Sequence, residues 1–283
     1  MFRSGADDGF ALLTTVSRRA RIGALVSDFY AGPVSRFDLG NGLIIDLFHG
    51  TLESVSDLAL FGGANALAIE AGPGTWEIVQ AGRAELIAPG RYRLSRLLRG
   101  QRGTESAMAG VVPAGARAVV LDAALTPLPI AVADLGLPAN WRVGPARRPL
   151  GDDSYTAVAF TPEGAGLRPF SVAHVEQPWR RARSPGDLTI RWARRSRSLA
   201  ADRWGPGEVP LAEDFEAYEV EVLQAGAVRR TLSTITTSVL YTTAQQTTDC
   251  GRLLGPGDSL ELRIYQLSAL VGRGAPHAVT LIF

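Results

Sequence analysis

The sequence is a succession of short segments in which apolar and polar residues alternate, separated by turns rich in glycine and proline. Alternation with a period of two is typical of β-strands that bury one face. In the second half of the chain this pattern predicts strands at residues 187–193, 218–223, 228–232, 239–242, 260–264 and 279–282. Strands at this spacing predict an antiparallel β-sandwich. The residues on the apolar face of three of these strands form its predicted core: Leu188, Ile190, Trp192, Tyr218, Val220, Val222, Leu260, Leu262 and Ile264.

The first half is also predicted to consist of short strands, with one short helix. The strands lie at residues 10–16, 22–26, 43–48, 116–122 and 155–160, with weaker candidates at 129–132 and 141–143. A helix is predicted over residues 54–61, because Ser54 or Ser56 can cap its start and a Gly-Gly pair ends it. Residues 161–169 contain two prolines and two glycines and are predicted to separate the halves. We therefore predict an all-β chain with an N-terminal β domain at residues 1–165 and a sandwich at residues 166–283.

The most informative segment of the first half runs from Thr75 to Glu105. Its sequence, TWEIVQAGRAELIAPGRYRLSRLLRGQRGTE, is interpreted as three short strands and a loop. Trp76 and Ile78 alternate with Glu77, which indicates a half-buried strand with the carboxylate outside. Pro89-Gly90 is predicted to be the turn of a hairpin.

The end of this segment is predicted to be a structured, exposed loop. Two glycines three residues apart permit backbone angles that other residues avoid. Arg99 and Arg102 are expected to hydrogen-bond Glu105 or nearby carbonyls, and the loop is expected to be a working surface for protein contacts. The residues of interest are Arg96, Arg99, Gly100, Arg102, Gly103, Thr104 and Glu105.

The amino-acid composition indicates the broad class to which the protein belongs. Hydrophobic residues make up 46% of the 283 residues and charged residues 20%, which is ordinary for a soluble globular protein. The single cysteine excludes an intrachain disulfide. The sequence contains no apolar run long enough for a membrane-spanning helix and no secretory signal. Its opening resembles the interior of a β region, so the chain is expected to be a fragment of a longer protein.

The polar residues of the sequence form no recognised catalytic or metal-binding pattern. The three histidines, His49, His174 and His277, are far apart and lack metal-ligand spacing. The sequence contains no G-x-S-x-G elbow, and its lack of lysine excludes a P-loop. Neighbouring carboxylates, such as Asp152 with Asp153 and Glu213 with Asp214 and Glu216, are more often solvated than catalytic. We therefore expect no enzymatic activity, no metal and no cofactor.

An arginine-rich segment with interleaved tryptophans is the strongest nucleic-acid signal. DNA binding is nevertheless disfavoured, because Trp192 belongs to the predicted core and nearby acidic residues offset the charge. An inter-subunit contact or a surface facing anionic lipopolysaccharide is at least as well supported. The tryptophans could instead stack on host glycans, although packing onto the sandwich edge is the simpler interpretation. The arginines are Arg180, Arg181, Arg183, Arg191, Arg194, Arg195, Arg197 and Arg203, and the candidate glycan contacts are Trp179, Trp204 and Trp141.

The run ELIAPGRYRLSRLLRGQRGTE resembles a signature of the large tail-tip proteins of long-tailed phages and gene transfer agents. The order of the flanking segments extends this resemblance over about residues 8–160. Leu188–Trp192, Tyr218–Val222 and Gly272–Gly274 resemble strands and a turn of a fibronectin type III module. The corner tyrosine of that module, expected near Leu260, is absent, so its hydrogen bond must be replaced or missing.

The resemblance implies a function as well as a fold. It implies a structural component of the tail tip or baseplate of a phage-like particle, with roles in host attachment, tip closure and DNA delivery. The implied partners are other tail-tip proteins (the hub and the distal tail protein), further copies in a homotrimer and the host cell surface. The protein would be made in the bacterial cytoplasm and reside in the virion. The alternative is a carbohydrate-binding module that recognises host surface glycans.

Overall fold

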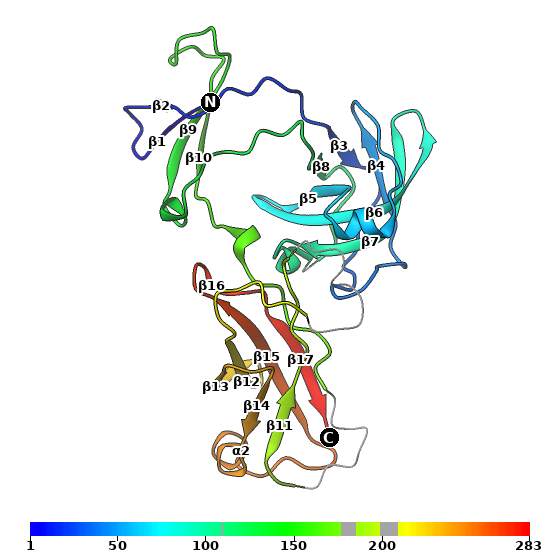
Figure 1. Cartoon of the computed structure of the whole chain (residues 1–283), viewed down its shortest axis with the longest axis vertical. Coiled ribbons are helices and arrows are strands. Elements are labelled where there is room, and N and C mark those ends of the chain that lie inside the picture. The colour runs from blue at the N-terminus through cyan, green and yellow to red at the C-terminus, as the bar shows by residue number, and fades with distance from the viewer. Residues whose placement is uncertain (109, 177–184, 199–208) are drawn as a thin grey trace.

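The computed structural model describes residues 1–108, 110–176, 185–198 and 209–283 (Figure 1). The described chain is mostly β-structure and forms a closed barrel, a small sheet and a β-sandwich. The all-β prediction is confirmed. Among the described residues, neither α-helix has the length and apolar character to cross a bilayer.

The barrel consists of six strands in the order β3-β4-β7-β6-β5-β8. Every neighbouring pair is antiparallel, and the closed order leaves the barrel without an open edge. Alternation along the strands places residues such as Ile45, Val79 and Leu94 in the barrel core. The strand bounds are β3 Ile22–Leu25, β4 Leu43–Leu47, β5 Ala66–Gly72, β6 Thr75–Ala88, β7 Arg91–Gln101 and β8 Arg117–Val120.

The predicted helix of the first half is shorter than expected, and it spans Asp57–Phe61 as α1. Ser56 caps it, since its Oγ accepts a hydrogen bond from the Ala59 amide at 3.2 Å. Gly62 follows directly as the C-terminal cap. The local capping signals therefore located this element to within a few residues.

The small sheet joins both ends of the N-terminal region, in the order β10-β9-β1-β2. The strands are β1 Phe2–Ser4, β2 Ala11–Leu12, β9 Ala139–Val143 and β10 Thr156–Phe160. The predicted strand at residues 10–16 forms the short strand β2, and Leu13 and Thr14 after it hydrogen-bond with Met1. The weak strand predicted at 129–132 is wrong, because a 3₁₀ helix at Val132–Asp134 follows an irregular segment there.

Trp141 lies on β9 and is only 4% exposed. Its Nε1 donates to the Phe160 carbonyl at 3.4 Å, and the Arg3 guanidinium lies 5.5 Å from the ring centre. The prediction that Trp141 contacts glycans is wrong, because its strand turns the ring into the structure. A stacking platform needs an exposed aromatic face.

The sandwich contains two sheets, β11-β14 and β13-β12-β15-β17, and β16 pairs with the end of β15. The nine residues predicted as its core all lie in one buried cluster, in which the Trp192 and Tyr218 rings meet edge to face at 5.2 Å. A 3₁₀ helix at Ala165–Leu167 precedes the sandwich. The strand bounds are β11 Leu188–Arg191, β12 Tyr218–Gln224, β13 Ala227–Thr234, β14 Ser238–Tyr241, β15 Ser259–Ser268, β16 Gly272–Arg273 and β17 His277–Ile282.

The corner between β14 and β15 contains a helix that the sequence analysis missed, α2 at Thr243–Cys250. Gln246 on this helix is fully buried. Its Nε2 donates to the carbonyls of Gly186 and Tyr241, each at 2.9 Å, and its Oε1 accepts from the Leu254 amide at 3.3 Å. Gln246 thus provides buried hydrogen bonds at the corner where the expected tyrosine is absent.

Candidate functional site at the joint of barrel and sandwich

The signature segment does not form an exposed loop. β7 continues through Arg99, Gly100 and Gln101, a turn follows, and a 3₁₀ helix begins at Glu105. These three β7 residues and Gly103 are buried. The prediction of three short strands with an exposed loop is therefore wrong, because β6 and β7 form one long hairpin (Figure 1) and β7 continues through residues that were expected in the loop.

Arg99 is the centre of a buried ion cluster within the barrel domain. It is 1% exposed, and it makes a bidentate pair with Glu77 at 2.7 and 2.9 Å. Its Nη1 donates to Asp38 at 3.0 Å and to the Tyr30 carbonyl at 2.8 Å. The guanidinium also lies over the Phe29 ring, 3.9 Å from its centre. The expected partner of Arg99, Glu105, is therefore replaced by two carboxylates distant in sequence.

The orientation of Glu77 is the reverse of the predicted one. Glu77 is 0% exposed and shares the inward face of β6 with Val79 and Ala81, whereas Trp76 is half-buried. A buried carboxylate requires a compensating charge and hydrogen bonds. Arg99 supplies the charge, and the Gly100 amide donates a further hydrogen bond to Glu77 at 3.1 Å.

Asp38 is held in its ionised form. Burial alone would raise the pKa of Asp38, but hydrogen bonds from the Asn41 side chain and amide and from Arg99 lower that pKa below its ordinary value. The distances from Asp38 to the Asn41 side chain and amide are 2.8 and 3.0 Å. The cluster therefore combines one cation with two anions, all shielded from water.

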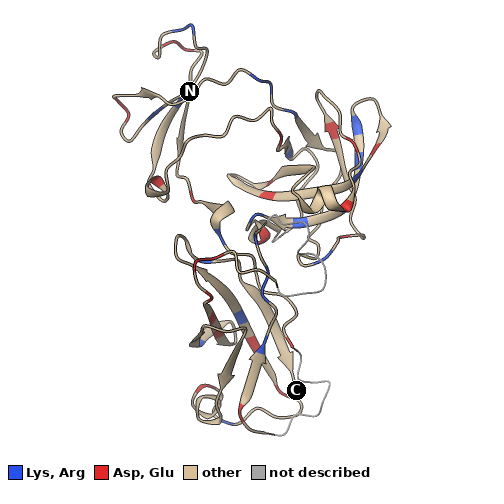
Figure 2. Ribbon diagram, viewed as in Figure 1, with Lys and Arg blue, Asp and Glu red and all other residues tan. Residues whose placement is uncertain are grey.

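Glu105 and Arg195 connect the barrel domain to the sandwich. The Glu105 carboxylate accepts a hydrogen bond from the Ser171 amide at 2.7 Å and forms an ion pair with Arg195. Arg195 also donates to the Val34 carbonyl at 2.9 Å and to the Ser171 carbonyl at 3.3 Å. Both charged side chains are largely buried. In Figure 2, acidic and basic segments lie close together where the barrel meets the sandwich.

Close backbone packing explains the two glycines of the signature. Gly103 has φ +76°, and a Cβ there would lie 2.6 Å from the Ala165 carbonyl oxygen. Gly100 has φ +57°, and a Cβ there would lie 2.7 Å from Cγ of Glu105. Thr104 completes the turn, since its Oγ1 accepts from the Ile78 amide at 2.8 Å and donates to the Gln101 carbonyl at 2.7 Å. These signature residues therefore form a tightly packed socket, in which Gly103 contacts the segment that leads into the sandwich.

His277 adds a titratable group to this joint. Burial lowers the pKa of His277 below its ordinary value, the Glu105 carboxylate opposes the shift and the Arg195 guanidinium adds to it. The neutral imidazole is therefore favoured beside the ion pair. Its strand, β17, begins at this residue.

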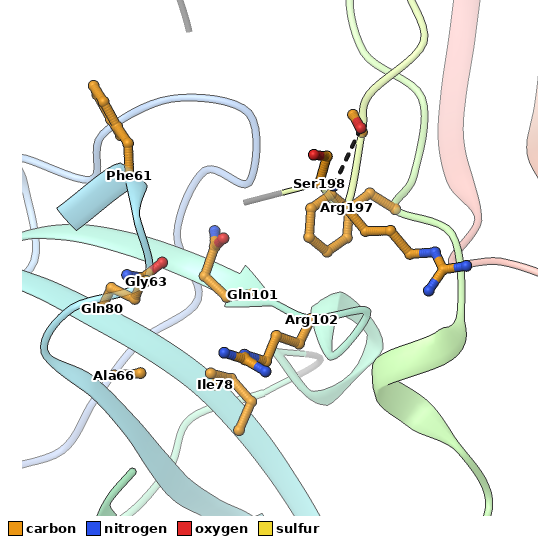
Figure 3. Close-up of a pocket in the computed structure, with 11 residues that line it drawn as sticks. Phe61, Gly63, Ala66, Ile78, Gln80, Gln101, Arg102, Arg197 and Ser198 are labelled. Carbon is orange, nitrogen blue, oxygen red and sulfur yellow. Dashed lines mark hydrogen bonds between the residues drawn. The ribbon is translucent and has the colours of Figure 1, made fainter. Parts of the chain in front are cut away.

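A pocket of about 40 Å³ lies between the barrel and the sandwich (Figure 3). Typical ligand pockets measure roughly 300–1,000 Å³, so this one is much smaller than a typical ligand site. Arg102 and Gln101 of the signature point toward it in Figure 3. The lining residues are Phe61, Gly63, Ala66, Ile78, Gln80, Gln101, Arg102, Phe170, Ser196, Arg197 and Ser198.

The arginine-rich segment is held largely by ion pairs where the structure describes it. Arg194 pairs with Glu216 at 3.1 Å, and Arg197 pairs with Glu213 at 2.7 Å. The carboxylates expected to be solvated are thus the partners of these arginines. Arg96, at the start of the signature, pairs with Asp57 at 2.6 Å. Several predicted residues lie outside the described chain: Trp179, Trp204, Arg180, Arg181, Arg183 and Arg203.

Sequence reasoning missed most of the partners that make this site. No local signal connects Asp38 with Arg99 or Glu105 with Arg195, because these pairs are 61 and 90 residues apart. A signal for Glu77 was present, since Val79 and Ala81 continue its alternation. Within the described ranges, no group of three or more His, Cys, Asp or Glu side chains is arranged to hold a metal ion.

The family model described as "Rcc01698-like, C-terminal" matches residues 20–119 of the chain. This family name is associated with gene transfer agents. The matched range coincides with the barrel, whose strands extend from Ile22 to Val120, and it contains the signature. It is narrower than the expected resemblance over residues 8–160.

Other comparisons add no functional assignment. No curated protein matches the chain. The extracellular domains d3–d4 of rat CD45 align with a TM-score of 0.28 and 11% identity, covering 56% of this chain and 71% of that one. The Endo-D glycoside hydrolase domain of Streptococcus pneumoniae R6 aligns with a TM-score of 0.26 and 9% identity, covering 92% of this chain and 32% of that one.

Proposed function

We propose that this chain is a structural component of the tail tip, or baseplate, of a phage-like particle of the gene-transfer-agent type. The family match over the barrel, which includes the signature segment, carries this proposal. In the particle the chain contributes to host attachment, tip closure and DNA delivery. Its partners are the hub and distal tail proteins and two further copies in a homotrimer.

The construction of the joint supports a structural role. Arg195 bonds groups on both sides of the joint, and Gly103 packs directly against the connecting segment. Charge-assisted hydrogen bonds in a largely buried setting hold two bodies in one arrangement better than exposed contacts do. A tail tip must keep its parts in register while it contacts a cell surface, and a fixed joint meets that need.

The proposed role is not catalytic. The carboxylates at the joint and beside it, Glu105, Glu213 and Glu216, are engaged by arginines. A general acid or base needs access to a substrate and a pKa matched to proton transfer. The pocket at the joint, at about 40 Å³, is far below the roughly 300–1,000 Å³ of a typical ligand site.

The direct test is to locate the chain in purified particles. An affinity tag on the chain, detected by electron microscopy with gold-labelled antibody, is expected to label one end of the tail. Recovery of the chain only as free protein, together with normal particles from a strain that lacks it, would overturn the proposal.

A matched pair of variants then tests the joint. Arg195→Met removes the ion pair with Glu105, whereas Arg252→Met removes a sandwich pair with Asp258 in which the arginine is exposed. We expect the first to lower the yield of functional particles and the second to leave it unchanged. Equal yields from both variants would show that the joint is not needed for assembly.

A further inference from the structure

The small sheet ends in two strands that each have one neighbour, β10 and β2. All five residues of β10 are exposed, including Val158 at 45% and Phe160 at 51%. None of the five is charged, and β10 is tan along its length in Figure 2. Soluble proteins usually protect an open edge with charges, proline or a bulge. This edge has none of these protections and is suited to pair with another strand.

The opposite edge of the sheet is formed by β2 and the residues that follow it. Ala11 and Leu12 pair with β1, and Leu13 and Thr14 extend this ladder by backbone hydrogen bonds with Met1. Leu12 is 62% exposed and Val16 is 52% exposed. This exposed segment, predicted as a strand over residues 10–16, is suited to pair with another strand on its outer side.

The direction of the strands makes the two edges complementary. The sheet has four strands, and every neighbouring pair is antiparallel, so β10 and β2 run in opposite directions. A rotation about an axis parallel to the strands preserves their directions. It would therefore place residues 11–16 of one copy antiparallel to β10 of the next, and the antiparallel ladder would continue.

Side-chain size and charge favour one register of this pairing. Directly opposite residues share a face, and Leu12 opposite Ala159 keeps each residue on the face that it already occupies. The same register places Leu13 opposite Val158 and brings Arg18 of one copy to Asp153 of the next. Leu12 then opposes a small residue, Leu13 and Val158 form an apolar pair, and the flanking charges have opposite sign.

We infer that copies of this chain join head to tail through the small sheet, β10 of one copy pairing with residues 11–16 of the next. The number of copies rests on the proposed function: in a homotrimer, three sheets of four strands give a closed ring of twelve. A five-residue strand contributes less than the roughly 800 Å² per partner of a stable interface. Other surfaces of the copies must therefore add to the contact.

Cysteine cross-linking tests the pairing itself. Leu12→Cys and Ala159→Cys are made in the full chain with Cys250→Ser, which removes the native thiol. Opposite Cα atoms in a ladder lie about 4.5–5.5 Å apart, within the range of a disulfide. A mixture of the two single variants should form covalent dimers on oxidation, and the double variant should form covalent trimers. Dimers from Val158→Cys alone, without cross-links from the mixture, would indicate a two-fold contact and overturn the inference.

Sedimentation of charged edge variants gives a second readout. Val158→Lys places a charge on the β10 edge, and Val228→Lys places one on the exposed edge strand β13 of the sandwich. We expect the first to weaken self-association at least about tenfold and the second to leave it unchanged. The inference would be overturned if the wild-type chain sediments as a monomer and the cysteine variants form no cross-links. If the chain is nevertheless found in particles, the proposed function stands without this inference.

Discussion

Replacing Arg99 with methionine tests whether the buried ion cluster stabilises the barrel. The change removes the bidentate pair with Glu77 and the contacts with Asp38 and the Tyr30 carbonyl. Both carboxylates remain almost fully buried, at 0% and 2% exposed. They would then lack the cation that compensates their desolvation.

The loss of this cation sets the expected decrease in the free energy of unfolding. Breaking a buried ion pair by removing one partner typically costs about 3–5 kcal/mol, because a charge is left uncompensated. The contact of the guanidinium with Phe29 adds up to about 2 kcal/mol when desolvated. Domains are stable by roughly 5–15 kcal/mol, so Arg99→Met should remove a large part of the stability of the barrel.

Urea unfolding followed by circular dichroism and by tryptophan fluorescence would measure this loss. Arg93→Met is the matched control, since Arg93 lies on the same strand in an exposed pair with Glu85. The control should cost less than about 1 kcal/mol. The double variant Glu77→Leu with Arg99→Met should regain part of the loss, because apolar residues can replace a buried pair. A cost below about 1 kcal/mol for Arg99→Met would refute the reasoning.

Three further predictions concern the socket, the sandwich corner and the response to acid. Gly100→Val should destabilise the barrel by roughly 2–4 kcal/mol, because φ is +57° and its Cβ would meet Glu105. The control Gly110→Val, where a Cβ meets nothing within 4 Å, should change the melting temperature little. Equal shifts in melting temperature for the two variants would contradict this prediction. Gln246→Leu should cost the sandwich about 2 kcal/mol, since it removes the hydrogen bonds that the buried side chain donates to the Gly186 and Tyr241 carbonyls, and chemical denaturation that shows no loss would count against that role. The pKa of Asp38 is lowered in the folded state, so its contribution to the free energy of unfolding is present above the unfolded value of 3.8 and is lost as the pH falls through the lower folded value. Asp38→Asn should flatten the acid limb of the stability–pH curve, and an unchanged slope would show that another group controls it.

Local patterns located most of the strands of both halves. The alternation of Leu188, Ile190 and Trp192 indicated a buried face, and that face lies in the sandwich core. The same logic failed for Glu77, because it assigns carboxylates to the outside and cannot anticipate a buried cation. Helix α2 was missed because its sequence, TAQQTTDC, has no apolar stripe. The capping box at Thr242 and Gln245 and the C-terminal cap Gly251 were the local signals for it.

The sequence by itself determined the all-β class, the turn positions and the residues of the sandwich core, because each depends on neighbours within a few positions. The tertiary structure alone decided that the barrel closes, that Arg99 meets Glu77 and Asp38, and that Glu105 meets Arg195. Alternation reports which face of a strand is buried, but it does not report what lies opposite that face. The joint between barrel and sandwich arises from such distant contacts, so only the folded chain reveals it.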